Sequence, residues 1–144
     1  MEELFNPYQR NAVYTALQIY EKSLLNAMRW LRGDVEEGIL VRRELHLPPH
    51  LRARAQEKIQ EALDEIKQLS EKFGFERKEE NIAAELRSEM NFRWVDMCER
   101  EASSLKGYGE VNPKLSSELD PSIQRLATLA VQLGLIFQEG ENKK

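Results

Sequence analysis

The sequence has little cysteine, glycine or proline, and it has no long apolar run. Its one cysteine, Cys98, cannot form an internal disulfide or a cysteine metal cluster, so a reducing compartment is expected. The acidic N-terminus, Met-Glu-Glu-Leu-Phe, lacks the apolar core of a signal peptide, and no run of apolar residues reaches transmembrane length. We therefore expect a cytoplasmic protein that does not enter a membrane.

The composition favours a soluble helical domain. Hydrophobic residues make up 41% of the 144 residues and charged residues 32%, with only 7 glycines and 5 prolines. This profile is typical of a charged helical protein and differs from those of a disordered chain and of a β-sandwich. The net charge of −4 argues against a surface devoted to nucleic acid.

The periodicity of the apolar residues predicts an all-α fold, an antiparallel bundle of four main helices in a single domain over residues 1–144. Asn6-Pro7 and Asp120-Pro121 are typical start signals for the first and last helices. The last helix is apolar around most of its circumference, so we expect it at the centre of the bundle. The expected helices span roughly residues 7–33, 49–73, 78–106 and 121–138.

Residues 34–48, between the first and second helices, are ambiguous. Asp34 and Glu37 have the spacing of a capping box, which favours a short helix. Apolar residues from Ile39 to Leu47 also alternate as in a strand, but a single strand has nothing to pair with. We therefore expect a short helix followed by extended chain, and a loop over residues 107–120.

The most distinctive local feature is the basic segment, residues 42–54. It carries four arginines against one glutamate and contains both histidines of the chain. Arginine forks bind phosphate or carboxylate, and the open N–H groups at a helix start favour an anion. The alternative is that these arginines pair with acidic residues of neighbouring elements. The candidates for anion binding or docking are Arg42, Arg43, His46, His50, Arg52 and Arg54.

No catalytic residue, metal site or cofactor is predicted. Pro48-Pro49 separates His46 from His50, and a third ligand is not evident. The carboxylates lack the Glu-x-x-His pairs of di-iron bundles and do not match the spacing of helical nucleotide pyrophosphohydrolases. Cys98 stands among acidic residues beside an apolar stripe, so we expect an inert buried thiol.

The sequence leaves three functions open. The preferred one is a non-enzymatic interaction module that self-associates as a homodimer, because the last helix has a broad apolar face and aromatic residues are spread over several helices. The first alternative is a phosphate- or nucleotide-binding protein, hydrolytic or not, that uses the basic segment. The second is a nucleic-acid accessory protein that uses the same segment.

Overall fold

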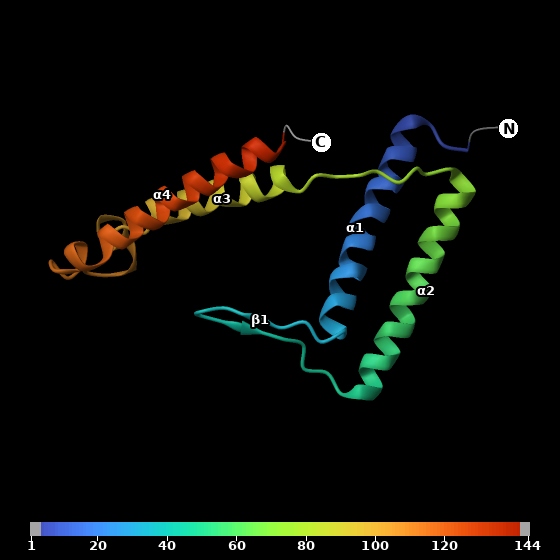
Figure 1. Ribbon diagram of the computed structural model, residues 1–144, viewed down its shortest axis with the longest axis horizontal. Helices are drawn as coiled ribbons and strands as arrows, with labels where there is room; N and C mark the ends of the chain where they lie inside the picture. Colours follow the sequence, from blue (N-terminus) through green and yellow to red (C-terminus); the bar gives the residue numbers. More distant parts are fainter. Residues whose placement is uncertain (1–3, 142–144) are drawn as a thin grey trace. The chain divides into compact units, whose positions relative to one another are not determined.

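The computed structural model describes residues 4–141, and its contacts divide the chain into two compact units. The N-terminal unit is Met1–Arg77 and the C-terminal unit is Lys78–Lys144. Each unit contains a pair of long helices, and the described residues hold one small two-stranded sheet, so the expected all-α class is confirmed (Figure 1). The organisation of residues 1–144 as a single bundle stays a prediction, and each unit is considered by itself.

The first helix of the N-terminal unit, α1 (Pro7–Leu31), begins at the predicted start signal. The Asn6 side chain accepts a hydrogen bond from the Gln9 N–H at 2.8 Å, and the Gln9 side chain accepts one from the Asn6 N–H at 3.0 Å. Two backbone donors that the helix leaves open are thereby satisfied, while Pro7 loses nothing by lacking one. The helix ends at Leu31, two residues before the predicted end.

The second helix, α2 (Pro49–Phe73), runs antiparallel to α1 and has the predicted bounds. Gly74 ends it with a left-handed backbone, at φ +65°, a conformation that favours glycine. At this end Phe5 stacks against Phe73 at 4.9 Å between ring centroids. At the other end a small apolar core joins α1, α2 and the chain between them. Its central members are Met28, Leu31 and Ile59.

The connection between α1 and α2 is a β-hairpin, so the predicted short helix is wrong. The strands β1 (Glu36–Glu37) and β2 (Arg42–Arg43) pair antiparallel, with Glu36 opposite Arg43 and Glu37 opposite Arg42. The expectation failed because it treated the strand as unpaired, whereas the chain folds back on itself across the turn at residues 38–41. Gly38 closes this turn, and a Cβ there would lie 2.7 Å from the Val41 carbonyl oxygen.

In the C-terminal unit, the helix predicted over residues 78–106 is divided. The helix α3 (Ala83–Cys98) is followed by a short 3₁₀ helix, η1 (Ala102–Tyr108). The Asn81 side chain accepts a hydrogen bond from the Ala83 N–H at 3.0 Å, which satisfies a donor at the start of α3. The prediction was too long at both ends because it extended the apolar stripe of α3 into flanking residues that are not α-helical.

The last helix, α4 (Leu115–Glu141), is longer than the predicted span of 121–138, and the predicted loop over 107–120 is correspondingly shorter. Pro121 lies inside α4 rather than at its first position. Asp120 does not cap α4; its carboxylate accepts a hydrogen bond from the Ala102 N–H at 2.8 Å. The Asp-Pro pair was misread as a start signal because the helix begins upstream, where Leu115 and Leu119 are already half-buried.

The helices α3 and α4 pack antiparallel, side by side (Figure 1). Small residues form the contact face of α4, where Ala127, Ala130 and Gly134 are buried. A Cβ at Gly134 would lie 3.2 Å from the Asn91 side-chain oxygen. Within its unit α4 therefore has helical neighbours on one side, and the expected central position is not observed there.

The close approach of the two helices gives a first prediction. Replacing Gly134→Leu forces a large side chain against α3, which should lower the free energy of unfolding by about 1–3 kcal/mol. Gly107→Leu is the control, because a Cβ at Gly107 meets no atom within 4 Å. Urea denaturation followed by circular dichroism measures both. Equal stability of the two variants would contradict the close packing at Gly134.

Candidate functional site

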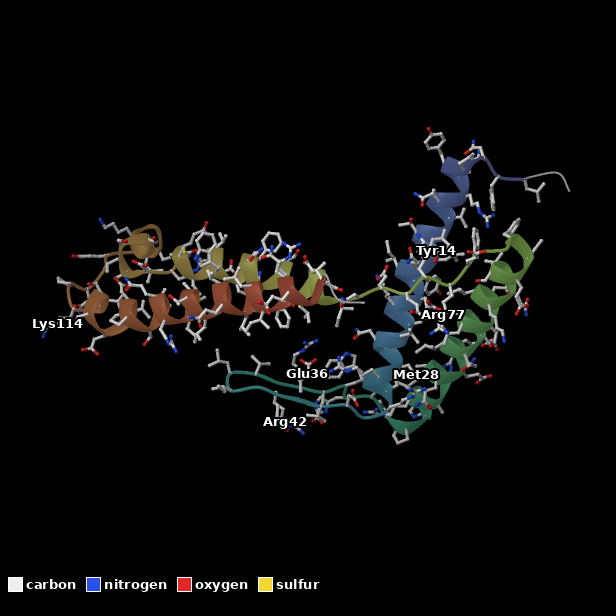
Figure 2. All side chains as sticks on the ribbon, turned by 45° about the horizontal axis from the view of Figure 1, so that its top comes forward. Tyr14, Met28, Glu36, Arg42, Arg77 and Lys114 are labelled. Atoms are coloured by element: carbon white, nitrogen blue, oxygen red, sulfur yellow. The ribbon has the colours of Figure 1, made fainter. Side chains whose placement is uncertain are left out.

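The structure places the first two candidate arginines, Arg42 and Arg43, on strand β2, where each pairs with a carboxylate. Figure 2 labels Arg42, and Glu36 on the neighbouring strand. Arg42 pairs with Glu37 at 2.7 Å and with Glu44 at 2.5 Å. Arg43 pairs with Glu36 at 3.1 Å. The positive charge that the sequence shows at residues 42 and 43 is thus balanced by carboxylates within the hairpin and the residue that follows it.

These ion pairs shift the pKa values of the groups that form them. The hydrogen bond from Arg42 holds the pKa of Glu44 below its usual value, although partial desolvation acts in the opposite direction. Hydrogen bonds to Glu44 and then to Glu37 raise the pKa of Arg42. Arg42 is exposed and Glu44 is half-buried, so solvent screens the pair and its contribution to stability is small.

A second set of contacts holds the root of the hairpin to the end of α1. Arg29 pairs with Asp34 at 2.8 Å, and the Glu36 carboxylate accepts from both Arg29 and Arg43 at 3.1 Å. The guanidinium carbons of the same two arginines lie 4.9 and 5.0 Å from the ring centroid of Trp30. Sequence reasoning missed Arg29, and its spacing of seven residues from Glu36 gave no helical signal across Gly33.

Arg52 acts inside the protein rather than at its surface. Its guanidinium donates hydrogen bonds to the carbonyl oxygens of Leu31 at 3.1 Å, Leu45 at 2.6 Å and Leu47 at 2.9 Å. These contacts join the start of α2 to the end of α1 and to the extended chain after the hairpin. All of the nitrogens of this half-buried fork are engaged by backbone oxygens, which leaves it little capacity for an external anion.

Of the remaining three candidates, His46 meets Arg42 at the Glu44 carboxylate, whereas His50 and Arg54 join none of the other candidates. His46 lies in the extended segment, mostly exposed, with its Nε2 atom 3.3 Å from Glu44. His50 and Arg54 are exposed on the first turns of α2, and within residues 4–141 neither side chain makes a hydrogen bond or ion pair. The arrangement is typical of internal ion pairing along a hairpin, and anion binding by these six residues stays a prediction.

The turn of the hairpin carries the first of two exposed apolar features. Ile39 is fully exposed and Leu40 is 93% exposed, at the point of the hairpin farthest from its root. A two-stranded hairpin alone is marginally stable in water, and here the ion pairs of Arg29, Arg42 and Arg43 brace it. The structure thus presents two apolar side chains to solvent on a braced hairpin.

The second feature lies on α4. We call four of its residues the α4 stripe: Leu126, Leu129, Leu133 and Ile136. Their spacing of three and four residues places them on one side of the helix, next to the face that packs on α3. Leu126 is 51% exposed, Leu133 41% and Ile136 59%, and Leu129 is half-buried. The fully buried residues of α4 are therefore small, while three of the four stripe residues are exposed.

Helix α3, which packs against α4, also leaves large apolar residues exposed. No residue of α3 is fully buried, and Phe92, Trp94 and Val95 are all exposed. Cys98, at its C-terminal end, is also exposed, so the expectation of a buried thiol is wrong. The helix ends at Cys98, and the chain that follows turns away instead of continuing the stripe on which the thiol was expected to be covered.

The chain exposes more surface than two compact proteins of half its mass would. The chain has a mass of 16.8 kDa and an accessible surface of 11,888 Å². Two compact proteins of half this mass would together expose about 9,200 Å², so the surplus is about 2,700 Å². A standard protein–protein interface buries about 800 Å² on each partner. The chain therefore exposes more surplus area than one such interface requires.

Comparisons with protein-family models, with curated proteins and with solved structures found no match to the chain. Across residues 4–141, no helix is both long and apolar enough to cross a membrane. In the same range, no three or more His, Cys, Asp or Glu side chains are grouped so that they could hold a metal ion.

The role of Arg52 can be tested by its own substitution. Arg52→Lys keeps the charge but removes the fork that reaches three carbonyls, and should lower the free energy of unfolding by about 2 kcal/mol. Arg54→Lys, two residues along the same helix, is the matched control and should change nothing measurable. Chemical denaturation compares the two variants, and an unchanged Arg52→Lys midpoint would contradict the structural role.

The lowered pKa of Glu44 predicts a pH dependence. A carboxyl whose pKa is lower in the folded state stabilises the fold above its unfolded pKa, about 4.3, and loses this contribution as pH falls through the folded value. The stability difference between the wild type and Glu44→Gln should therefore be present at neutral pH and vanish in acid. Melting temperatures from pH 7 to pH 3 measure it, with Glu71→Gln as an exposed control. A difference that grows on acidification would contradict the pairing.

Proposed function

We propose that this protein is an interaction module that self-associates through the C-terminal unit, with the α4 stripe as the contact surface. The observation that carries the proposal is the exposure of Leu126, Leu133 and Ile136 on a helix that packs through alanine and glycine. Two helices alone bury too little apolar surface for an independent core, whereas two such pairs can form a four-helix bundle.

The chemistry of this surface suits a second copy of the same chain. Residues 126–138 contain no charged side chain. A charged patch would meet its own charge across a two-fold axis, whereas an uncharged apolar patch is compatible with itself. The surplus of exposed area is large enough to supply such an interface.

Anion binding is the weaker hypothesis because the carboxylates and carbonyls of the same unit already engage Arg42, Arg43 and Arg52. An external phosphate would have to displace these contacts. The same argument applies to nucleic acid as a ligand of the basic segment. The exposed apolar surface of α4 supports an interaction role.

A substitution on the stripe tests the proposal. Ile136→Glu places a charge in the proposed interface twice, once from each copy, and should raise the dimer dissociation constant at least tenfold. Sedimentation equilibrium over a range of protein concentrations measures this, and circular dichroism verifies that the helices persist. Thr128→Glu adds the same charge to an exposed position of α4 outside the stripe and should leave the constant unchanged.

The same measurement can overturn the proposal. A wild-type chain that is a monomer at every accessible concentration would reject self-association. A dimer that survives Ile136→Glu but dissociates in Ile39→Ser/Leu40→Ser would assign the contact to the turn of the hairpin and reject the α4 stripe.

A further inference from the structure

Three polar residues, spaced seven positions apart, lie beside the α4 stripe, and their charges indicate how two copies would pair. Arg125, Gln132 and Glu139 are all exposed. Seven residues make almost two turns of helix, so all three lie along one side of α4, each directly before or near a stripe residue. Within residues 4–141, the side chains of Arg125 and Glu139 make no hydrogen bond or ion pair. The inference drawn from them rests on the proposed self-association.

We infer that two copies pair α4 against α4 in antiparallel orientation, about a two-fold axis at Gln132. In such a pair, a residue that stands n positions before Gln132 in one copy lies opposite the residue that stands n positions after Gln132 in the other copy. Arg125 and Glu139 are each seven positions away, so Arg125 of one copy faces Glu139 of the other, twice per dimer. Residues beside an apolar seam select the orientation of helices in this way.

The stripe gives nearly the same register. In an antiparallel pair, the two apolar positions of each repeat alternate across the seam, and each layer joins one type to the other. The layers that do this join Leu126 to Ile136 of the other copy and Leu129 to Leu133, and they are centred on residue 131. Four apolar layers result, and no stripe residue is left without an apolar neighbour. The centre of the apolar layers and the centre of the charge pairs thus differ by one residue, about 1.5 Å along the helix.

A parallel pair lacks these contacts. Each residue would then lie level with its own copy, so Arg125 would stand at the level of Arg125 and Glu139 at the level of Glu139. The two charges of one helix are separated by fourteen residues, about 21 Å at 1.5 Å per residue, and no opposite charges would meet. The charge pattern therefore discriminates between the two orientations of a second copy.

Charge exchange tests the pairing. Arg125→Glu makes both flanking charges negative, and Glu139→Arg makes both positive, so each variant should dimerise about tenfold more weakly than the wild type. A mixture of the two variants should regain association, because each negative chain then faces a positive one. The double variant Arg125→Glu/Glu139→Arg should dimerise like the wild type. Sedimentation velocity and mass measurement of the mixture provide the readout.

Crosslinking tests the orientation directly. In a Cys98→Ser background, Gln132→Cys should crosslink two copies efficiently through a short bismaleimide, since the position lies at the proposed axis. Arg125→Cys is the matched control, and its two thiols should lie about 21 Å apart and fail to crosslink. Both variants keep the α4 stripe intact, so their solution masses report self-association separately.

The outcomes distinguish this inference from the function on which it rests. Crosslinking at position 132 alone, with recovery in the charge mixture, supports the antiparallel pair. A dimer that crosslinks equally at 125 and 132, or that is indifferent to both charge variants, overturns the inference and leaves self-association standing. A monomeric Cys98→Ser chain overturns both.

Discussion

The close packing of α4 on α3 through Ala127, Ala130 and Gly134 determines which apolar residues of the C-terminal unit are buried and which stay exposed. Small residues allow the two helices to approach closely, but they remove little apolar area from water. The larger residues of α4 are left beside this seam and remain exposed. A helix pair built in this way is stable to the extent that its exposed stripe is covered, and the uncharged character of residues 126–138 makes a second copy a suitable cover.

In the N-terminal unit, polar contacts hold the hairpin in place. A short hairpin has almost no core of its own, so these contacts fix it to the end of a helical pair. Arg29, Arg43 and Trp30 hold its root, and Arg52 ties the neighbouring chain to both helices through backbone carbonyls. Arg42, Arg43 and Arg52 of the basic segment are therefore all engaged by groups of their own unit. The apolar turn that they support, Ile39-Leu40, is a second surface on which the N-terminal unit could make contacts.

The sequence predicted helices well where apolar periodicity and capping residues agreed, as at Asn6-Pro7 and Gly74. It misplaced the start of α4 because Asp120-Pro121 has the residues of a helix start, whereas the Asp120 carboxylate binds the Ala102 N–H eighteen residues earlier. The hairpin was not predicted because its apolar residues lie in the turn and its strands are Glu-Glu and Arg-Arg. The arginine candidates were found, but their partners depend on the folded register and could not be read from spacing.

The α4 stripe is proposed to be covered by a second copy. Amide hydrogen exchange over residues 126–136, measured across a dilution series, tests it most directly, because binding slows exchange only where the fold is stabilised by association. If a second copy covers the stripe, protection of this segment should fall on dilution as the dimer dissociates, while protection in α1 and α2 stays constant. Protection of residues 126–136 that is unchanged by dilution, in a sample whose mass is that of the monomer, would contradict it.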